Sequence, residues 1–266
     1  MVSYTGKLHT LLVDMELLLE VFVFVILMVL IATDKGRLAA LIARSYEDWI
    51  LDIVNLFFQV VLIPVFKTAV LYQLYHYFLP SYRQSGDVPP VAAFCLSFVF
   101  VDYLFYWNHR LLHTRWFWRV HEVHHTITEM DVIATSRETL WSTFFTVYPW
   151  VHALFIYLLR DPIWYVAGIS LSSTMSLWRH STFSPTPSSW LYRRLSVFLI
   201  LPNDHAWHHA SRYNRRNYGS NLKLWDMLHG TYYKCDRLPE RLGVKTHLTL
   251  IQKLLWPFSQ PKIKYR

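Results

Sequence analysis

Long apolar runs with few charges fill the first two thirds of the chain and predict membrane helices. Each run is close to the roughly 20 residues that cross a hydrocarbon core, although the first and last are short. The second also contains Asp52, Asn55, Gln59 and Pro64, so we expect a broken or re-entrant element that faces protein rather than lipid. The five runs are residues 17–32, 49–70, 88–107, 140–159 and 163–178.

The last two runs are separated by residues 160–162 alone, which predicts a tight helical hairpin. The segments that follow residues 107 and 178 are then two crossings apart and emerge on the same membrane face. From residue 179 to the end there are 15 Lys or Arg against 4 Asp or Glu. By the positive-inside rule this face is cytoplasmic. The stretch 190–202 is apolar with two arginines and is expected in the interface plane.

The composition favours the same class of protein. The chain is 53% apolar and 17% charged, against about 25% charged residues in soluble domains. Its net charge of +8 follows membrane segments rather than forming a soluble basic module, so we expect a membrane and no nucleic acid as partner. The sequence predicts an all-α protein: a bundle of about four to five membrane helices under a cytoplasmic helical cap.

No repeat or linker divides the chain, so we expect a single domain over residues 1–266. Its membrane helices would lie mainly within 17–178. The end of the chain carries Lys262 and Lys264, fifth and third from the terminus respectively, which is the dilysine pattern of endoplasmic reticulum retrieval. We therefore expect the endoplasmic reticulum in a eukaryote, and the inner membrane in a bacterium.

Nine of the fourteen histidines fall into clusters with the spacing of metal ligands. Residues three or four apart on a helix lie on one face, so each cluster can aim two imidazoles at one point. Polar anchoring at the membrane surface could explain one pair, but so many imidazoles together would repel one another when charged unless a cation organises them. Nine nitrogens exceed the needs of one ion and predict two. The nine are His109, His113, His121, His124, His125, His180, His205, His208 and His209.

Imidazole suits zinc, iron, copper and nickel alike, so the spacing alone names neither a metal nor a reaction. The order of motifs is more specific. Across residues 102–232 the chain resembles the fatty acid hydroxylase and sterol desaturase superfamily. The resemblance is carried by Asp102 to His113, the box His121-Glu-Val-His-His125, His180, the box His205-Ala-Trp-His-His209, Asn217-Tyr-Gly219 and Trp225-Asp226.

This resemblance implies a membrane-embedded di-iron centre, built from residues 102–125, 180 and 205–231, that uses oxygen to hydroxylate or desaturate a lipid. The substrate would be a fatty acyl, alkyl-ether or sterol lipid. No catalytic residue beyond the metal ligands is expected, and zinc could replace iron in a purified sample. Because no flavin or nicotinamide motif is present, electrons would come from a b-type cytochrome, a ferredoxin or tetrahydropterin.

Two departures from the family pattern bear on which branch of the superfamily the chain resembles. Thr139 stands where many members have a histidine two residues after an arginine, here Arg137, and Asp204 stands where some carry an extra histidine. Both departures weaken assignment to a sterol-specific branch. The chain looks somewhat closer to alkylglycerol monooxygenases and to bacterial sterol desaturase-like proteins.

Several polar residues are candidates for holding the ligands in place. Asp102 lies two helical turns before His109 and is expected to orient a ligand ring, or else to be a plain hydrogen-bonding group between helices. The weaker candidates for the same role are Glu122, Glu138, Asp204 and Asp226. Asn217 is expected to support the site by shaping a turn behind it. An apolar tunnel is expected along Trp141, Phe144, Phe145 and Trp178, although these aromatics fit ordinary helix packing equally well.

Two other functions compete with oxidation. A metal-dependent membrane hydrolase would need an open metal position and a general base, for which Glu122 is the candidate. A metal transporter would place its ligands near the middle of the membrane. The histidine boxes follow the apolar runs instead, so the transporter is the least favoured of the three.

Overall fold

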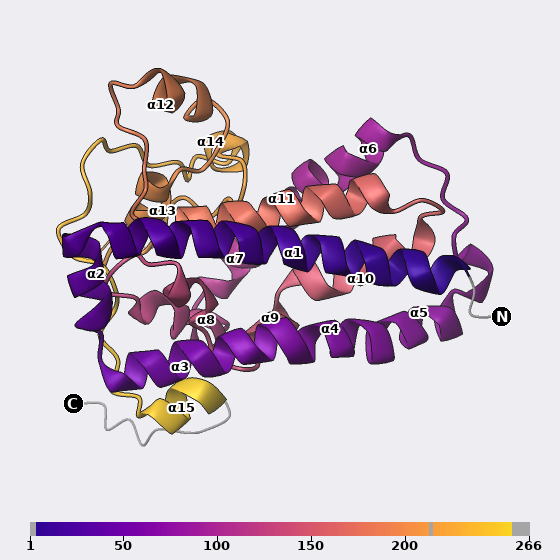
Figure 1. The fold of residues 1–266 in the computed structure, drawn as a ribbon, viewed down its shortest axis with the longest axis horizontal. Coiled ribbons are helices and arrows are strands. Elements are labelled where there is room, and N and C mark those ends of the chain that lie inside the picture. The colour runs from indigo at the N-terminus through magenta and orange to yellow at the C-terminus, as the bar shows by residue number, and fades with distance from the viewer. Residues whose placement is uncertain (1–3, 213–214, 257–266) are drawn as a thin grey trace.

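The structure is a computed structural model that describes residues 4–212 and 215–256, with side chains from residue 18. Within these residues the fold is helical, and three isolated β-bridges are the only strand-like pairing. Long helices lie side by side along the long axis, and shorter ones gather towards one end (Figure 1). The predicted all-α fold is confirmed. The dilysine pair lies outside the described residues.

The second apolar run is not broken or re-entrant, so that prediction is wrong. It belongs to one continuous 33-residue helix, Tyr46–Phe78, long and apolar enough to cross a membrane. A π-helical turn precedes Pro64, which sits in the first turn of the next segment, where its missing N–H is tolerated. The segments are α3 (Tyr46–Phe57), η1 (Phe58–Leu62), α4 (Ile63–Phe66), η2 (Lys67–Leu71) and α5 (Tyr72–Phe78).

The polar residues of this helix bond to protein. Asn55 Nδ2 donates to the carbonyl of Glu138 at 2.7 Å, and Gln59 Nε2 donates to the carbonyl of Ser136 at 3.3 Å. These bonds fasten the helix to the loop that follows the box His121–His125. The polar side chains therefore reflect packing against the cap and not an interruption of the helix.

The other membrane-length helix is Pro90–Leu112, of 23 residues. It extends past residue 107 and carries His109 in its last turn. Its segments are α6 (Pro90–Cys95), η4 (Leu96–Phe100) and α7 (Val101–Leu112). The helix α11 (Ile163–Arg179) packs against α6 and η4, and on another side against α1 (Tyr4–Thr33). A Cβ at Gly168 would collide with Ser97 Oγ, so glycine permits this close approach.

The run 140–159 is not one helix, which corrects the prediction. It divides into α9 (Ser142–Phe145) and the 12-residue α10 (Val147–Leu158), with Thr146 extended between them. Asn108 holds the break, because its side chain donates to the carbonyl of Phe145 and accepts from the N–H of Val147. The predicted short connection to α11 is confirmed, and a 2.9 Å hydrogen bond joins His152 Nδ1 to the hydroxyl of Tyr165 across the hairpin.

The outer faces of the long helices are covered by large apolar side chains that remain exposed in the fold. So much exposed apolar side chain on long helices is a surface for lipid rather than water. Together with the two membrane-length helices it indicates a membrane-associated protein. Members of this surface include Leu18, Phe22, Val25 and Val29 on α1, and Ile53, Phe57, Val61 and Val65 on the helix Tyr46–Phe78.

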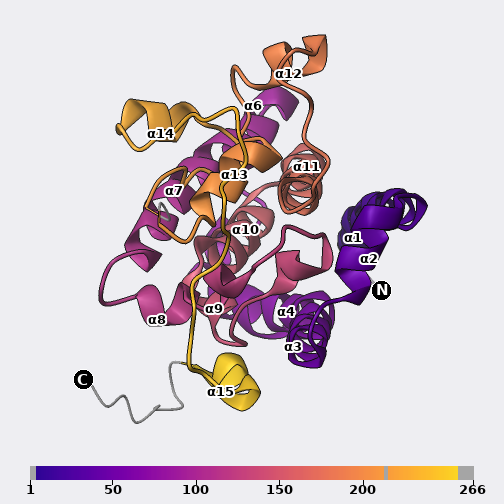
Figure 2. The ribbon, with the colours of Figure 1, turned by 90° about the vertical axis from the view of Figure 1, so that its left-hand side faces the viewer.

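Short helices build the end of the molecule that holds the histidines. Seen along the long axis, α13 lies between α7 and α8 on one side and α11 and α1 on the other (Figure 2). The ends of three histidine-bearing helices therefore meet. The remaining elements are α2 (Lys35–Ile42), η3 (Pro80–Tyr82), α8 (Trp118–His121), η5 (His124–Thr126), η6 (Ile133–Ser136), α12 (Trp190–Leu195), α13 (Pro202–His208), α14 (Leu224–Leu228) and α15 (Leu250–Leu255).

Candidate metal centre

The nine histidines of the sequence motifs meet in two groups at this end of the bundle. In each group, one potential ligand atom per residue lies within 4.8 Å of all the others. Eight of the nine side chains are buried and His124 is half-buried. The first group is His109, His113, His121, His125 and His208; the second group is His124, His180, His205 and His209.

Each histidine doublet is split between the groups. His124 belongs to the second group and His125 to the first, while His208 belongs to the first and His209 to the second. Successive residues of a helical turn point about 100° apart, so neighbours in a doublet cannot face the same point. Residues four apart do stay together, as the spacing predicted. The boxes thus bridge two adjacent centres.

Backbone carbonyls orient one histidine from each box. His109 Nδ1 lies 2.8 Å from the carbonyl oxygen of Tyr218, and His208 Nδ1 lies 2.7 Å from that of Arg216. A ring that donates its Nδ1 proton to a carbonyl keeps a lone pair on Nε2 for a cation. These two bonds anchor the first group to the segment 216–218.

The second group is anchored in the same manner by other segments. His124 Nδ1 lies 3.0 Å from the carbonyl oxygen of Arg137, and His180 Nδ1 lies 2.9 Å from that of Ser176. The Ser176 carbonyl belongs to the preceding turn of α11, so His180 is fixed by its own helix. His124 depends on a loop that lies after its box.

The ring nitrogens at the centre of each group lack the partners that neutral imidazoles need. The Nε2 atoms of His109 and His121 are 3.0 Å apart, and those of His180 and His205 are also 3.0 Å apart. Buried polar atoms without partners are costly. A cation in each group would take the lone pairs of the Nε2 atoms that converge there, so the residues fit two metal ions. Among the described residues, the buried ring nitrogens with no hydrogen bond are Nδ1 of His113, His125, His205 and His209, and Nε2 of His208.

Burial keeps these rings in the form that binds metal. It lowers the pKa of His121, His125 and His205 well below the usual value, and positive charge on neighbouring rings lowers it further. Burial likewise lowers the pKa of His124 to about 4. The imidazoles are therefore neutral at pH 7, with a lone pair available for coordination.

The polar residues expected to orient ligands bond to backbone rather than to histidine rings. Asp226 accepts from the N–H groups of Tyr218 and Gly219 at 2.8 and 2.7 Å. Asn217 has a φ of 53° and donates from its side chain to the carbonyl of Asp204 at 2.9 Å. Both residues fix the segment 216–218, whose carbonyls accept hydrogen bonds from His109 and His208.

Asp102 and Asp204 act on the same region. Asp102 accepts from the N–H groups of Asn221 and Leu222 at 2.8 and 3.0 Å, and makes no direct bond to a histidine. Asp204 accepts from the Nζ of Lys223 at 3.2 Å. The aspartates thus hold the segment 217–223. They act on the histidine rings through this segment and not by the direct hydrogen bonds that the sequence suggested for Asp102.

A buried ion network supports the loop that orients His124. Arg137 bonds Asp52 through two parallel contacts of 2.8 Å, and it also pairs with Asp48 at 2.9 Å. Arg44 contacts the same Asp52 carboxylate. The sequence pattern does not show this network, because Arg137 and Asp52 are 85 residues apart. The sign of it in the sequence is Asp52, a charged residue within the apolar run 49–70.

A largely apolar cavity of about 540 Å³ lies between the long helices and reaches both groups. Five of the nine clustered histidines line it, His109, His121, His124, His180 and His205, and so does His152. The prediction that Trp141, Phe144, Phe145 and Trp178 form its wall is wrong, since none of them lines it. Phe144 packs edge-on against Phe66 of the helix Tyr46–Phe78 instead, because α9 is a separate short helix. Phe105 and Tyr148 take the lining positions.

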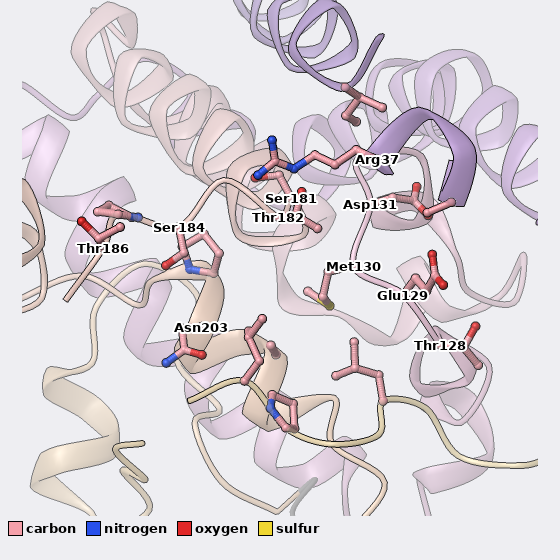
Figure 3. Close-up of a pocket in the computed structure, with 18 of the residues that line it drawn as sticks. Arg37, Thr128, Glu129, Met130, Asp131, Ser181, Thr182, Ser184, Thr186 and Asn203 are labelled. Carbon is pink, nitrogen blue, oxygen red and sulfur yellow. The ribbon is translucent and has the colours of Figure 1, made fainter. Parts of the chain in front are cut away.

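A second cavity, of about 490 Å³, lies outside the metal centre. Figure 3 shows Arg37 and Asp131 on one side of it and Asn203 on the other. No histidine of the described residues lines this cavity, although its lining includes Ser181 and Ala206, which follow His180 and His205 in the chain. The cavity that reaches the histidines is therefore the candidate active site.

Comparison with known proteins agrees with the site. Residues 94–231, just over half of the chain, match the fatty acid hydroxylase family. The chain is 32% identical over 146 residues to a fatty acid hydroxylase of Lecanicillium sp, covering 50% of this chain and 40% of that protein. It is 28% identical over 179 residues to an ornithine lipid hydroxylase of Rhizobium tropici, covering 65% and 52%. It is also 28% identical over 180 residues to a methylsterol monooxygenase of Arabidopsis thaliana, covering 61% and 62%.

The chain thus spans about half the length of these curated relatives. No solved structure matches it. All nine clustered histidines fall within the matched residues, as do the segment 217–223 and its supporting aspartates. The resemblance read from the motifs is confirmed: the chain belongs to the fatty acid hydroxylase family.

Proposed function

We propose that the protein is a membrane-bound, non-haem di-iron oxygenase that hydroxylates or desaturates a lipid with oxygen and an external electron donor. One observation carries the proposal. Two histidine groups, each suited to one ion, line a single apolar cavity between membrane-length helices. A lipid chain in that cavity would face both groups at once.

The nine histidines would be the ligands, five for one ion and four for the other. Bound iron would supply the redox chemistry that oxidises an unactivated carbon–hydrogen bond. The protein's own task is to hold the rings neutral and oriented, through the carbonyls of Arg216, Tyr218, Arg137 and Ser176. Asp102, Asn217 and Asp226 would support that orientation through the backbone, and Asp204 through the side chain of Lys223.

The cavity would bind the lipid and exclude water. Its walls come from α1, the helix Tyr46–Phe78, α10 and α11, so the substrate chain would lie along the bundle. The three relatives are named for a fatty acid, an ornithine lipid and a methylsterol. They share a lipid substrate but differ in lipid class, so the proposal is limited to a lipid.

We place the centre at the cytoplasmic face, in the endoplasmic reticulum of a eukaryote or the inner membrane of a bacterium. The basic residues of the cap support this orientation. The donor would be a b-type cytochrome, a ferredoxin or tetrahydropterin. The chain would act as one domain, because its long helices and its cap both contribute walls and ligands to the same site.

Hydrolysis is less well supported than oxidation. Its expected general base, Glu122, bonds the side chain of Thr246 and does not line the histidine cavity. A base that cannot reach a substrate in the cavity cannot activate water there. No other feature of the site favours hydrolysis over oxidation.

The test is lipid analysis of cells that express the protein under ¹⁸O₂. The wild type should yield a lipid that carries one ¹⁸O atom, or a lipid two hydrogens lighter, and His124→Ala should yield neither. His247→Ala is the matched control, because His247 is exposed and belongs to neither group. Identical lipid profiles for the wild type and His124→Ala, or label that comes from H₂¹⁸O, would contradict the proposal.

A further inference from the structure

A buried cation lines the cavity beside the metal centre. Arg179 is the last residue of α11 and directly precedes His180. Its side chain is only 2% exposed, yet it belongs to the cavity wall. A buried guanidinium is retained only when its charge and its several N–H donors find partners.

The partners of Arg179 are neutral. Its guanidinium donates to Ser220 Oγ at 2.7 Å and to Asn221 Oδ1 at 3.3 Å. Within residues 18–212 and 215–256 no carboxylate forms an ion pair with it. The carboxylate of Asp102 accepts from the N–H of Asn221 and is close enough to act on Arg179 electrostatically, but it does not line the cavity. The positive charge at the cavity wall is therefore not neutralised by direct contact.

Two hydroxyl groups accompany Arg179 at the wall. Ser220 and Tyr148 both line the cavity. The Tyr148 hydroxyl is buried near Ser220 and Arg179, and it makes no hydrogen bond of normal geometry within the described chain. The largely apolar cavity, whose other charged residues are Glu20, Lys67 and Glu138, thus has one corner with a cation and two hydroxyl groups. Such a corner suits the acidic end of a lipid and not its hydrocarbon tail.

The corner is close to the histidines. The carbonyl of Tyr218 receives His109, and only two residues of chain, at most about 7 Å, lead from Tyr218 to Ser220. On the other side Arg179 is covalently next to His180. A carboxylate held here would leave only a short stretch of hydrocarbon between itself and both groups.

We propose that Arg179, with Ser220 and Tyr148, binds the carboxylate of an acyl lipid and so directs oxidation to the first few carbons from that carboxylate. The inference rests on the proposed function and narrows its substrate to lipids with an acidic head group. A guanidinium matches a carboxylate through two parallel hydrogen bonds, which lysine cannot reproduce.

The cavity has another cation, which provides a matched control. Lys67 begins η2, eight residues after Gln59 along the helix Tyr46–Phe78, about 12 Å further from the cap. A carboxylate bound by Lys67 would place the lipid the other way round, with its tail at the histidines. Variants of Arg179 and Lys67 therefore separate the two orientations.

The experiment measures binding to metal-free protein in phosphatidylcholine nanodiscs, with palmitate and hexadecanol as probes. These ligands share a chain length and differ in the carboxylate. We expect the wild type to bind palmitate at least tenfold more tightly than hexadecanol. Arg179→Gln should lose that preference while its affinity for hexadecanol stays within twofold. Lys67→Gln should keep the preference, and Arg179→Lys should keep only part of it.

Two results would overturn the inference: a wild type without preference for palmitate, or loss of the preference in Lys67→Gln but not in Arg179→Gln. If Arg179→Gln does not fold, Ser220→Ala takes its place and should reduce the preference severalfold; an unchanged preference in Ser220→Ala would also overturn it. Binding needs neither metal nor oxygen. Failure of the proposed oxidation, seen in the ¹⁸O₂ test, is therefore distinct from failure of this inference.

Discussion

The two histidine groups perform similar tasks but are assembled differently. Four of the five histidines of the first group come from residues 109–125, and only His208 is distant in sequence. The second group takes its four histidines from three separate stretches: His124, His180 and the pair His205 and His209. The first group is thus mainly a product of local chain geometry, whereas the second requires the whole bundle to be packed.

The carbonyl groups that orient the histidines also come from nearby residues in the first group and from distant ones in the second. The first group depends on the carbonyls of Arg216 and Tyr218, within one short segment. In the second group, His124 depends on the carbonyl of Arg137, whose side chain is locked to Asp52 of the helix Tyr46–Phe78. The second group should therefore respond to disturbances of the membrane helices that leave the first group intact.

The largest expected effect is that of metal removal. A chelator should abolish lipid oxidation and lower the free energy of unfolding, by about 4 kcal/mol for an ion present at a thousandfold excess over its Kd. The ion of the second group should leave first, since it has fewer ligands from more dispersed segments. Iron content and thermal unfolding, followed through a chelator titration, check this order. Simultaneous release of both ions would remove the contrast between the groups.

Substitution of single ligands comes next. His113→Ala in the first group and His209→Ala in the second should each lower product formation by about 100-fold or more, because even outer partners of ligands change metal affinity by about 10- to 100-fold. Each variant should retain about one ion per chain, in the intact group. Metal analysis combined with iron spectroscopy distinguishes the two remaining sites. A variant that keeps both ions and full activity would show that its histidine is not a ligand.

Arg137→Met should weaken iron binding by the second group alone. It removes the bidentate partner of the buried Asp52 carboxylate, at a cost of about 3 kcal/mol in the free energy of unfolding. His124 should lose its fixed orientation, and iron should be depleted from the second group first. Arg160→Met is the control, because the Arg160–Asp87 pair is exposed and contributes less than about 1 kcal/mol. Equal iron loss from both groups would contradict the proposed division of supports.

The smallest expected effect is that of Asp226→Asn, which acts on the first group. The substitution weakens two charge-assisted hydrogen bonds to the N–H groups of Tyr218 and Gly219, at a cost of about 1–2 kcal/mol. Iron affinity should fall about tenfold in the first group and stay unchanged in the second. Iron titration of the apoprotein measures both affinities, and a change confined to the second group would reverse the comparison.

The sequence by itself determined the helical class, the nine clustered histidines and their pairing at a spacing of three or four residues. These features depend on local geometry: a helix places residues four apart on one face whatever surrounds it. Hydrophobic runs likewise located the long helices. They did not show the break at Thr146, because the side chain of Asn108 that holds the break lies on another helix.

Only the tertiary structure decided which member of each doublet joins which group, since that depends on how α7, α11 and α13 meet. It also decided that the aspartates act through the backbone of residues 217–223 and not through histidine rings. The contacts of Arg179 with Ser220 and Asn221, about 40 residues away in the chain, could not be read from spacing. Partners of buried charges are chosen by packing, and packing brings together residues that no local pattern connects.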